Sequence, residues 1–284
     1  MTLTNEIKKQ ILDLVYIKPR TVDEVAKSID KNWRTADRYV KQISSEEGII
    51  GLRTFRGGTR GALKIVFWNN LDKINSSSVQ QKLIKLIEIG KTKKDFSPFD
   101  IYQYVDKKRK RAFLEYREDK NEAVNQNLTG FLRSAEHQIL HFSGNNSWIN
   151  LIENNIKLVD TVEEIAKSGI KIKILSRVEL IGLENIKKVL AINQRIGKDM
   201  IEIRHCNQPL RGFVIDDKEA RFREEIDKEL YQKGEFKGEK AIFYEINDPG
   251  WVSWLQKVFW NLFRQSISAE KRIKDLEDIH KMDF

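Results

Sequence analysis

Three cationic side chains recur at helical spacing between residues 33 and 44, namely Arg34, Arg38 and Lys41. At about 100° per residue they share one side of a helix. The opposite side carries the apolar residues Ala36, Val40 and Ile43. A guanidinium can donate two parallel hydrogen bonds to a guanine edge or a phosphate, whereas an ammonium binds phosphate as a point charge. The segment is therefore suited to contact a polyanion while its apolar face packs inward.

Two helical segments precede this one and would position it. Residues 5–16 have an apolar face and predict a helix that ends before Pro19, which cannot donate a backbone hydrogen bond. Thr21 and Glu24 match a capping box, which predicts the start of a second, short helix. Asn32 is a favourable N-cap for the third helix. The order helix, short helix, turn and cationic helix is typical of a helix-turn-helix.

A basic hairpin follows the three helices. Residues 49–56 and 62–68 read as strands, and the glycine-rich segment 57–61 between them permits positive φ. The hairpin carries Arg53, Arg56, Arg60 and Lys64. Three helices closed by such a hairpin resemble the winged-helix family over residues 4–68. In that family the third helix enters the major groove and the wing touches the flanking backbone.

The resemblance implies double-stranded DNA as the partner. The expected DNA-binding residues are Arg34, Thr35, Arg38, Lys41, Arg53, Arg56, Arg60 and Lys64. Arg34 and Arg38 are best suited to base edges, and the remaining cations to phosphates that set the register. Winged helices also mediate protein contacts, but the outward cations favour DNA. Trp33, at the start of the third helix, is expected in the core.

The net charge of +9 lies entirely in the first half of the chain. Residues 1–68 carry +5, residues 69–136 carry +4, and residues 137–284 are neutral. A polyanionic partner for the front half would release condensed counterions on binding. A solvated basic surface that keeps the protein in solution is the alternative explanation.

Composition limits the class of protein. A chain of 284 residues predicts more than one domain, and 40% hydrophobic with 33% charged residues excludes collagen-like and wholly disordered chains. No stretch approaches the roughly 18 apolar residues of a membrane span, and the first residues lack a signal-peptide core. A single cysteine, Cys206, excludes an intrachain disulfide framework and a multi-thiolate zinc site. We therefore expect a cytoplasmic, nucleoid-associated protein without membrane contact, metal or cofactor.

The segment 71–136 predicts a helical connector that could build a dimer interface. Its most prominent feature is a run of five cations at 107–111. Such a run is commonly a solvated helix face, and the functional alternative is additional phosphate contact beside the winged helix.

From residue 137 the pattern changes to alternating strands and helices. Strands are expected at 137–143, 170–175, 200–205, 212–216, 219–223 and 241–246, with helices at 156–167 and 183–195 and a final helix through Trp251 and Phe263. Trp260 lies off the apolar stripe of that last helix and could face a partner subunit. The pattern predicts an α/β domain with a mixed sheet.

This back segment resembles one half of a phospholipase D fold over roughly residues 135–265, and also the effector domain of TrmB-type archaeal transcriptional regulators. The phospholipase D signature is His-x-Lys-x-x-x-x-Asp, and the matching positions here are Pro209, Arg211 and Asp216. Proline offers no nucleophile, so the resemblance implies a domain without that catalytic step, and the chain is expected not to be an enzyme. Arg211 and Asp216 are expected to form a structural ion pair, and ligand contact is the alternative.

The expected architecture is therefore α+β and α/β in three parts: a winged helix-turn-helix at 1–70, a helical connector at 71–136, and a phospholipase D-like α/β domain at 137–284. The leading hypothesis is a homodimeric, DNA-binding transcriptional regulator whose back domain senses a small-molecule effector or joins subunits. The second is an architectural chromatin protein that tolerates any sequence. The third is a nuclease or phosphodiesterase with an unrecognised site.

Overall fold

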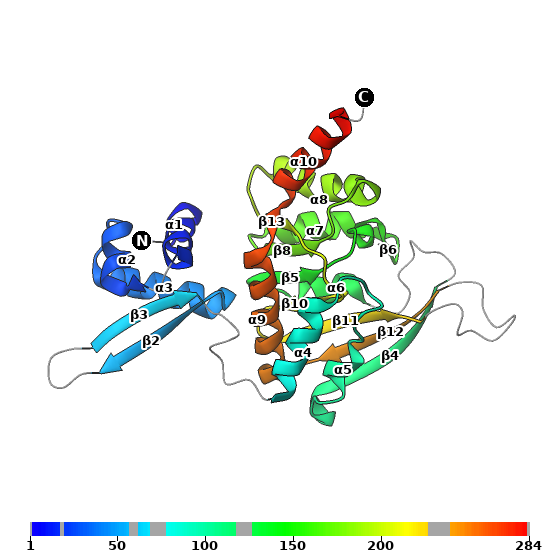
Figure 1. Cartoon of the computed structure of the whole chain (residues 1–284), viewed down its shortest axis with the longest axis horizontal. Helices are drawn as coiled ribbons and strands as arrows, with labels where there is room; N and C mark the ends of the chain where they lie inside the picture. Colours follow the sequence, from blue (N-terminus) through cyan, green and yellow to red (C-terminus); the bar gives the residue numbers. More distant parts are fainter. Residues whose placement is uncertain are drawn as a thin grey trace, which may run out of the picture. The chain divides into compact units, whose positions relative to one another are not determined.

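A computed structural model describes residues 2–17, 20–56, 62–68, 78–117, 127–226 and 239–282. The chain forms two compact units, residues 1–75 and 76–284 (Figure 1). The first is a small helical unit closed by a hairpin, and the second is built on a large mixed sheet. The α+β and α/β fold class expected from the sequence is confirmed.

The first unit contains three helices and a three-stranded sheet. The helices are α1 (Asn5–Ile17), α2 (Val22–Ser28) and α3 (Trp33–Glu47). The strands are β1 (Arg20–Thr21), β2 (Ile50–Arg56) and β3 (Ala62–Trp68), antiparallel in the order β1-β3-β2. Each helix contributes to one core, in which Ile11, Val25, Val40 and Val66 are fully buried.

The second unit is organised around an eight-stranded sheet in the order β13-β9-β8-β5-β10-β11-β12-β4. Its central strands β5 (Gln138–Phe142), β8 (Lys171–Ser176) and β9 (Ile201–His205) are parallel. The antiparallel strands are β10 (Gly212–Ile215), β11 (Glu219–Glu225), β12 (Glu239–Ile246), β4 (Lys110–Arg117) and β13 (Ile267–Ser268). A separate small hairpin is formed by two antiparallel strands of two residues each, β6 (Ile152–Glu153) and β7 (Ile156–Lys157).

Helices cover both faces of this sheet (Figure 1). On one face, α6 (Leu128–Arg133), α7 (Leu158–Lys167) and α8 (Leu183–Ile196) share an apolar core with Ile172 and Ile174 of β8. On the other face lies α9 (Pro249–Gln265), whose Phe259 ring meets the ring of Phe142 on β5 edge-on at 5.2 Å. Beside α9 lies α4 (Ser78–Ile89) (Figure 1), and the Asn261 amide donates to Glu88 across the two helices at 2.9 Å.

The second unit contains further helices and turns. They are α5 (Phe99–Tyr102), α10 (Ala269–Met282) and the 3-10 turns η2 (Lys107–Arg109), η3 (Ser147–Asn150) and η4 (Leu180–Gly182). In the part of the chain that the structure describes, no helix is both long and apolar enough to cross a membrane.

Two sequence-based expectations for the second unit were wrong. The connector expected to be helical over 71–136 contains strand β4, whose backbone pairs with β12 from Lys110 opposite Ile246 to Arg117 opposite Glu239. Trp260 does not face outward, since only 1% of its surface is exposed and its ring packs against Phe259 and Phe263. The division into three segments remains a proposal, although β4 places part of the middle segment in the large sheet.

Candidate nucleic-acid interface

Local capping interactions determine where helices α2 and α3 begin. The Thr21 hydroxyl accepts from the Glu24 amide at 3.1 Å, and the Glu24 carboxylate accepts from the Thr21 amide at 2.8 Å, so the predicted capping box starts α2. The Asn32 side chain accepts from the Thr35 amide at 2.9 Å and caps α3. Gly48, with a φ of 63°, ends α3 in the left-handed conformation that glycine adopts without steric cost. The two predicted helix starts are therefore confirmed.

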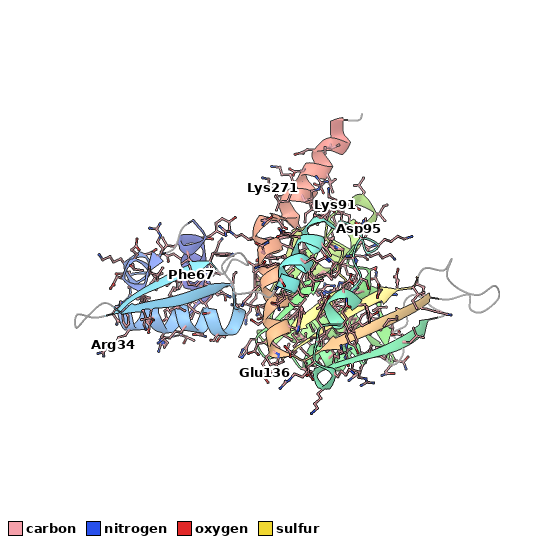
Figure 2. The ribbon with its side chains drawn as sticks, turned by 60° about the horizontal axis from the view of Figure 1, so that its bottom comes forward. Arg34, Phe67, Lys91, Asp95, Glu136 and Lys271 are labelled. Carbon is pink, nitrogen blue, oxygen red and sulfur yellow. The ribbon has the colours of Figure 1, made fainter. Side chains whose placement is uncertain are left out.

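The two faces of α3 divide as the sequence predicts. Ala36, Val40 and Ile43 are buried at 1% exposure or less. Arg34 and Arg38 are exposed on the other side, and Arg34 projects from the ribbon into solvent (Figure 2). The Arg38 guanidinium lies 5.2 Å from the centroid of the Tyr39 ring. The helix therefore presents guanidinium groups on an outward face while the opposite face forms core.

The sequence analysis did not identify Asp37, a carboxylate that lies beside these cations. Asp37 accepts from the Lys41 ammonium at 2.8 Å and from the Lys64 ammonium at 2.7 Å, and so ties α3 to β3. Partial burial acts to raise the pKa of Asp37, but the hydrogen bonds from Lys41 and Lys64 outweigh it and hold that pKa below its usual range. The same hydrogen bond raises the pKa of Lys41. Asp37 is therefore ionised at neutral pH and offsets part of the charge of both lysines.

Trp33 does not lie in the core, where the sequence analysis expected it. Its side chain is 38% exposed, and the Lys64 ammonium lies 4.9 Å from the centroid of the ring. The indole cannot reach the core from the first turn of α3, because the residues turned inward on this helix begin at Ala36. Trp33 instead lies on the outer surface, where Lys64 packs over it.

The hairpin forms where the sequence predicts the wing. Its strands pair from Ile50 opposite Trp68 to Arg56 opposite Ala62. The backbones of Arg53 and Arg56 lie in β2, but their side chains fall outside the described residues, as does all of Arg60. The roles expected for these three arginines as phosphate contacts remain predictions.

In the second unit, Arg211 and Asp216 do not form the expected ion pair, because they lie beyond opposite ends of β10. The Asp216 carboxylate accepts from the backbone amides of Glu136, His137 and Gln138 at 2.8, 3.0 and 2.8 Å. Its backbone carbonyl accepts from the Gln256 amide of α9 at 2.5 Å. Asp216 therefore joins the start of β5, the end of β10 and α9.

Arg211 lies at the other end of β10, where it is influenced by the positive charge of Arg177. Its guanidinium donates to the carbonyls of Gln208 and Leu210 at 2.9 and 2.6 Å. It packs so closely on Gly144 that a β-carbon there would lie 2.9 Å from the Arg211 Nε. Burial, and secondarily the charge of Arg177, lower the pKa of Arg211 to about 10. Guanidinium groups bind anions well. Ligand contact, the alternative role expected for Arg211, therefore remains a prediction.

Other polar groups near these strands do not assemble a metal site. His205 accepts from the Val178 amide at 3.0 Å through Nδ1, and burial raises the pKa of the neighbouring Cys206. Within the described ranges, no group of three or more histidine, cysteine or acidic side chains is placed to hold a metal ion.

His141 on β5 is a buried titratable residue whose environment the sequence does not reveal. Its ring stacks on Phe213 with centroids 3.8 Å apart, and Nδ1 donates to the Gly212 carbonyl at 2.9 Å. Burial, opposed only in part by that hydrogen bond, lowers the pKa of His141 to about 3. The imidazole is therefore neutral in the folded protein across the physiological range.

His141 makes the stability of the second unit depend on pH. Below its ordinary pKa of 6.5, the unfolded chain binds a proton at His141 that the folded chain excludes until about pH 3. The free energy of unfolding should then fall by up to about 1.4 kcal/mol for each pH unit from 6.5 downward. Urea unfolding at pH 7, 6, 5 and 4 should show a shallower decline for His141→Phe. Equal slopes for the two proteins would contradict this assignment.

Comparisons with known proteins give weak likenesses. No family model matches the chain, and no curated protein matches it. Nuc from Salmonella typhimurium, a phospholipase D family member, covers 56% of this chain and 97% of its own at 12% identity and a TM-score of 0.39. TrmBL2, an archaeal chromatin protein described as showing a novel mode of DNA binding, covers 94% of each chain at 14% identity and a TM-score of 0.37. Polyphosphate kinase from Porphyromonas gingivalis covers 79% of this chain and 55% of its own at 8% identity and a TM-score of 0.35.

These comparisons correct one expectation from the sequence. The chain was expected not to be an enzyme because Pro209 stands where the phospholipase D signature has histidine. The similar structures include a phospholipase D family member and a kinase, which are enzymes. The exclusion of enzymes was therefore wrong.

Proposed function

We propose that this chain binds double-stranded DNA through the winged helix of its first unit and acts as a transcriptional regulator. The observation that carries the proposal is the outward face of α3, where Arg34 and Arg38 are exposed opposite a fully buried apolar face. Guanidinium groups on a helix of this kind can reach base edges in the major groove. Lys41 and Lys64 flank them and are suited to phosphates.

The second unit would then join two copies of the chain or respond to a small-molecule effector. A homodimer fits the proposal, because a single small winged helix gains affinity and half-site specificity when it is paired. Association with the nucleoid would follow from DNA binding itself.

A sequence-tolerant chromatin protein is the second candidate. It is favoured by the exposure of Arg34, Arg38 and Lys41 on α3, because these cations can bind phosphates without reading any base. In this case the same winged helix would bind all duplexes with similar affinity.

Selection from a random duplex pool, followed by sequencing, tests the proposal. A narrow consensus with two-fold symmetry is the result expected for a dimeric regulator. Salt-sensitive binding without enrichment of any sequence would favour the chromatin protein. Failure to retain duplex even at 50 mM salt would refute DNA binding altogether, since non-specific contacts are strong under that condition.

For Asp37 we predict that a substitution in the proposed interface strengthens DNA binding. Replacing Asp37 by asparagine removes one negative charge from the proposed interface and releases the ammonium groups of Lys41 and Lys64. We expect the variant to bind every duplex several-fold more tightly at low salt, with a salt dependence steeper by roughly one phosphate contact. Fluorescence anisotropy between 50 and 200 mM salt measures both quantities. Weaker binding would mean instead that the carboxylate is needed to hold the two lysines in place.

A further inference from the structure

The basic run at 107–111 is held in a defined conformation in the second unit. Lys107–Arg109 form the 3-10 turn η2, which Asp106 caps by accepting from the Lys108 amide at 2.7 Å. The Arg109 amide donates to the Asp106 carbonyl at 2.9 Å, and the Arg109 carbonyl accepts from the Asn247 amide at 3.0 Å. The turn is thus attached to the end of β12, so its side chains extend from a fixed base.

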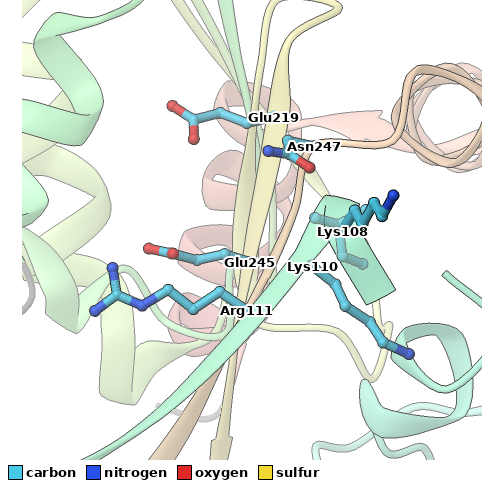
Figure 3. Close-up of a pocket in the computed structure, with 7 residues that line it drawn as sticks. Lys108, Lys110, Arg111, Glu219, Glu245 and Asn247 are labelled. Atoms are coloured by element: carbon cyan, nitrogen blue, oxygen red, sulfur yellow. The ribbon is translucent and has the colours of Figure 1, made fainter. Parts of the chain in front are cut away.

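The five cations of the run have different surroundings. Lys110 is half-buried, donates to the Tyr102 carbonyl at 2.8 Å and lies 4.6 Å from the centroid of the Tyr102 ring, which makes it structural. Arg111 lies beside Glu245 and points to one side of the sheet, whereas Lys108 points to the other (Figure 3). The cavity at this position is lined by both Glu219 and Glu245 in addition to the cations, so its mixed charge does not favour an anion.

The remaining three cations, Lys107, Lys108 and Arg109, are all exposed. We call them the η2 cations. Within the described ranges, their side chains make no hydrogen bond and no ion pair. Elsewhere in this unit many cations are neutralised, as in the pairs Lys173–Glu202 at 2.6 Å, Arg221–Glu245 at 2.7 Å and Arg195–Glu163 at 2.7 Å. The η2 cations therefore form a consecutive, exposed group that is not ion-paired within the described part of the chain.

Two of the acids near the turn, Asp106 and Glu245, already have partners. The Asp106 carboxylate accepts from the Lys108 backbone amide, and Glu245 is ion-paired with Arg221. Tyr104, which precedes the turn, is 51% exposed and stacks on Trp251 with centroids 6.5 Å apart. The surface around η2 thus combines unneutralised cations with an exposed phenol that can donate to a phosphate oxygen.

We propose that the η2 cations are a second contact to the phosphate backbone of duplex DNA, carried by the second unit and separate from α3. This inference rests on the proposed function. Successive side chains of a 3-10 turn are about 120° apart, so the three cations fan out and about two of them can reach one backbone at a time. Such contacts carry no sequence information, but they add affinity and fix the orientation of the second unit on the duplex.

The test uses the full chain with Lys107, Lys108 and Arg109 all replaced by glutamine. Its matched control replaces Lys187, Lys198 and Lys274 by glutamine, which removes the same charge from exposed positions of the same unit. Affinity for a 40-base-pair duplex of mixed sequence is measured by anisotropy between 50 and 200 mM salt. Thermal melting of both proteins confirms that the fold is retained.

For the variant at η2 we expect roughly tenfold weaker binding at 100 mM salt than for the control. The salt dependence should also become shallower by about one to two phosphate contacts, at roughly 0.9 in the logarithmic slope for each contact. Equal affinity and slope in the variant and the control would overturn the inference. Loss of binding to phosphatidylserine vesicles with unchanged DNA binding would overturn it too, and would assign the turn to a membrane surface.

A parallel measurement on the Arg34→Ala, Arg38→Ala protein separates this inference from the proposed function. If that protein binds DNA weakly while the variant at η2 equals its control, the winged helix binds DNA and the second contact does not exist. If the unaltered chain binds no duplex at all, the proposed function fails, and the inference fails with it.

Discussion

The double replacement of Arg34 and Arg38 by alanine should abolish high-affinity binding of the chain to its preferred duplex. Both side chains are exposed on α3, one helical turn apart, and a bidentate contact to a base is worth roughly 1–3 kcal/mol of discrimination. Together the two losses should weaken binding to the selected duplex by a factor on the order of 100 or more. Binding to a duplex of random sequence should fall much less, so the two affinities should converge.

The control for this prediction removes equal charge from the same unit. Lys9 on α1 and Lys27 on α2 are exposed, and alanine suits both helices. A Lys9→Ala, Lys27→Ala protein should keep its preference for the selected duplex. If the control and the arginine variant lose the same affinity on every duplex, the arginines act through net charge alone. The chromatin candidate would then replace the regulator.

Local sequence signals predicted the first unit well, because its structure depends on contacts between residues close in the chain. The capping box of Thr21 and Glu24, the Asn32 cap and the apolar spacing of α3 each act within one helical turn. The hairpin likewise joins neighbouring strands. The angular separation of cations from apolar residues on α3 correctly predicted that Arg34 and Arg38 are exposed, but the exposure of Trp33 was not predicted.

Strand β4 could not be predicted in the same way, because its partner is distant in sequence. Residues 110–117 pair with β12 at 239–246, and the sequence between them contains most of the second unit. Phe113 stacks on Phe243 with centroids 5.2 Å apart, a contact that exists only after the sheet has formed. A short segment with cations at both ends has no local signal that separates an exposed helix from an edge strand.

In the candidate interface, too, contacts between residues distant in the sequence could not be predicted. Asp37 and Lys41 are four residues apart, so their ion pair could have been found from helical spacing. The second pair, from Asp37 to Lys64, joins residues 27 apart and depends on how β3 packs beside α3. The exposure of Trp33 has the same cause, since Lys64 reaches over its ring from β3.

Asp216 is a residue of the second unit whose replacement should cost much stability. Its carboxylate is 2% exposed and accepts from three successive backbone amides, at Glu136, His137 and Gln138. Asp216→Ala would leave these donors without an acceptor, at about 1–3 kcal/mol for each one that remains buried. Alanine is also unfavourable at the Asp216 φ of 47°. We expect the free energy of unfolding to fall by on the order of 3–5 kcal/mol, measured by urea titration.

Two further variants separate the carboxylate from the backbone effect. Asp216→Asn tolerates the same φ and keeps one acceptor oxygen, so its loss of stability should be clearly smaller than that of alanine. The neighbouring Asp217 is exposed, and Asp217→Ala should change the free energy of unfolding by less than about 0.5 kcal/mol. If Asp216→Ala were as stable as Asp217→Ala, the carboxylate would not be holding β5, and the amides of residues 136–138 would have to be satisfied by water. Because the Asp216 carbonyl also accepts from Gln256, the loss should reach α9 and appear in the near-ultraviolet signal of its tryptophans.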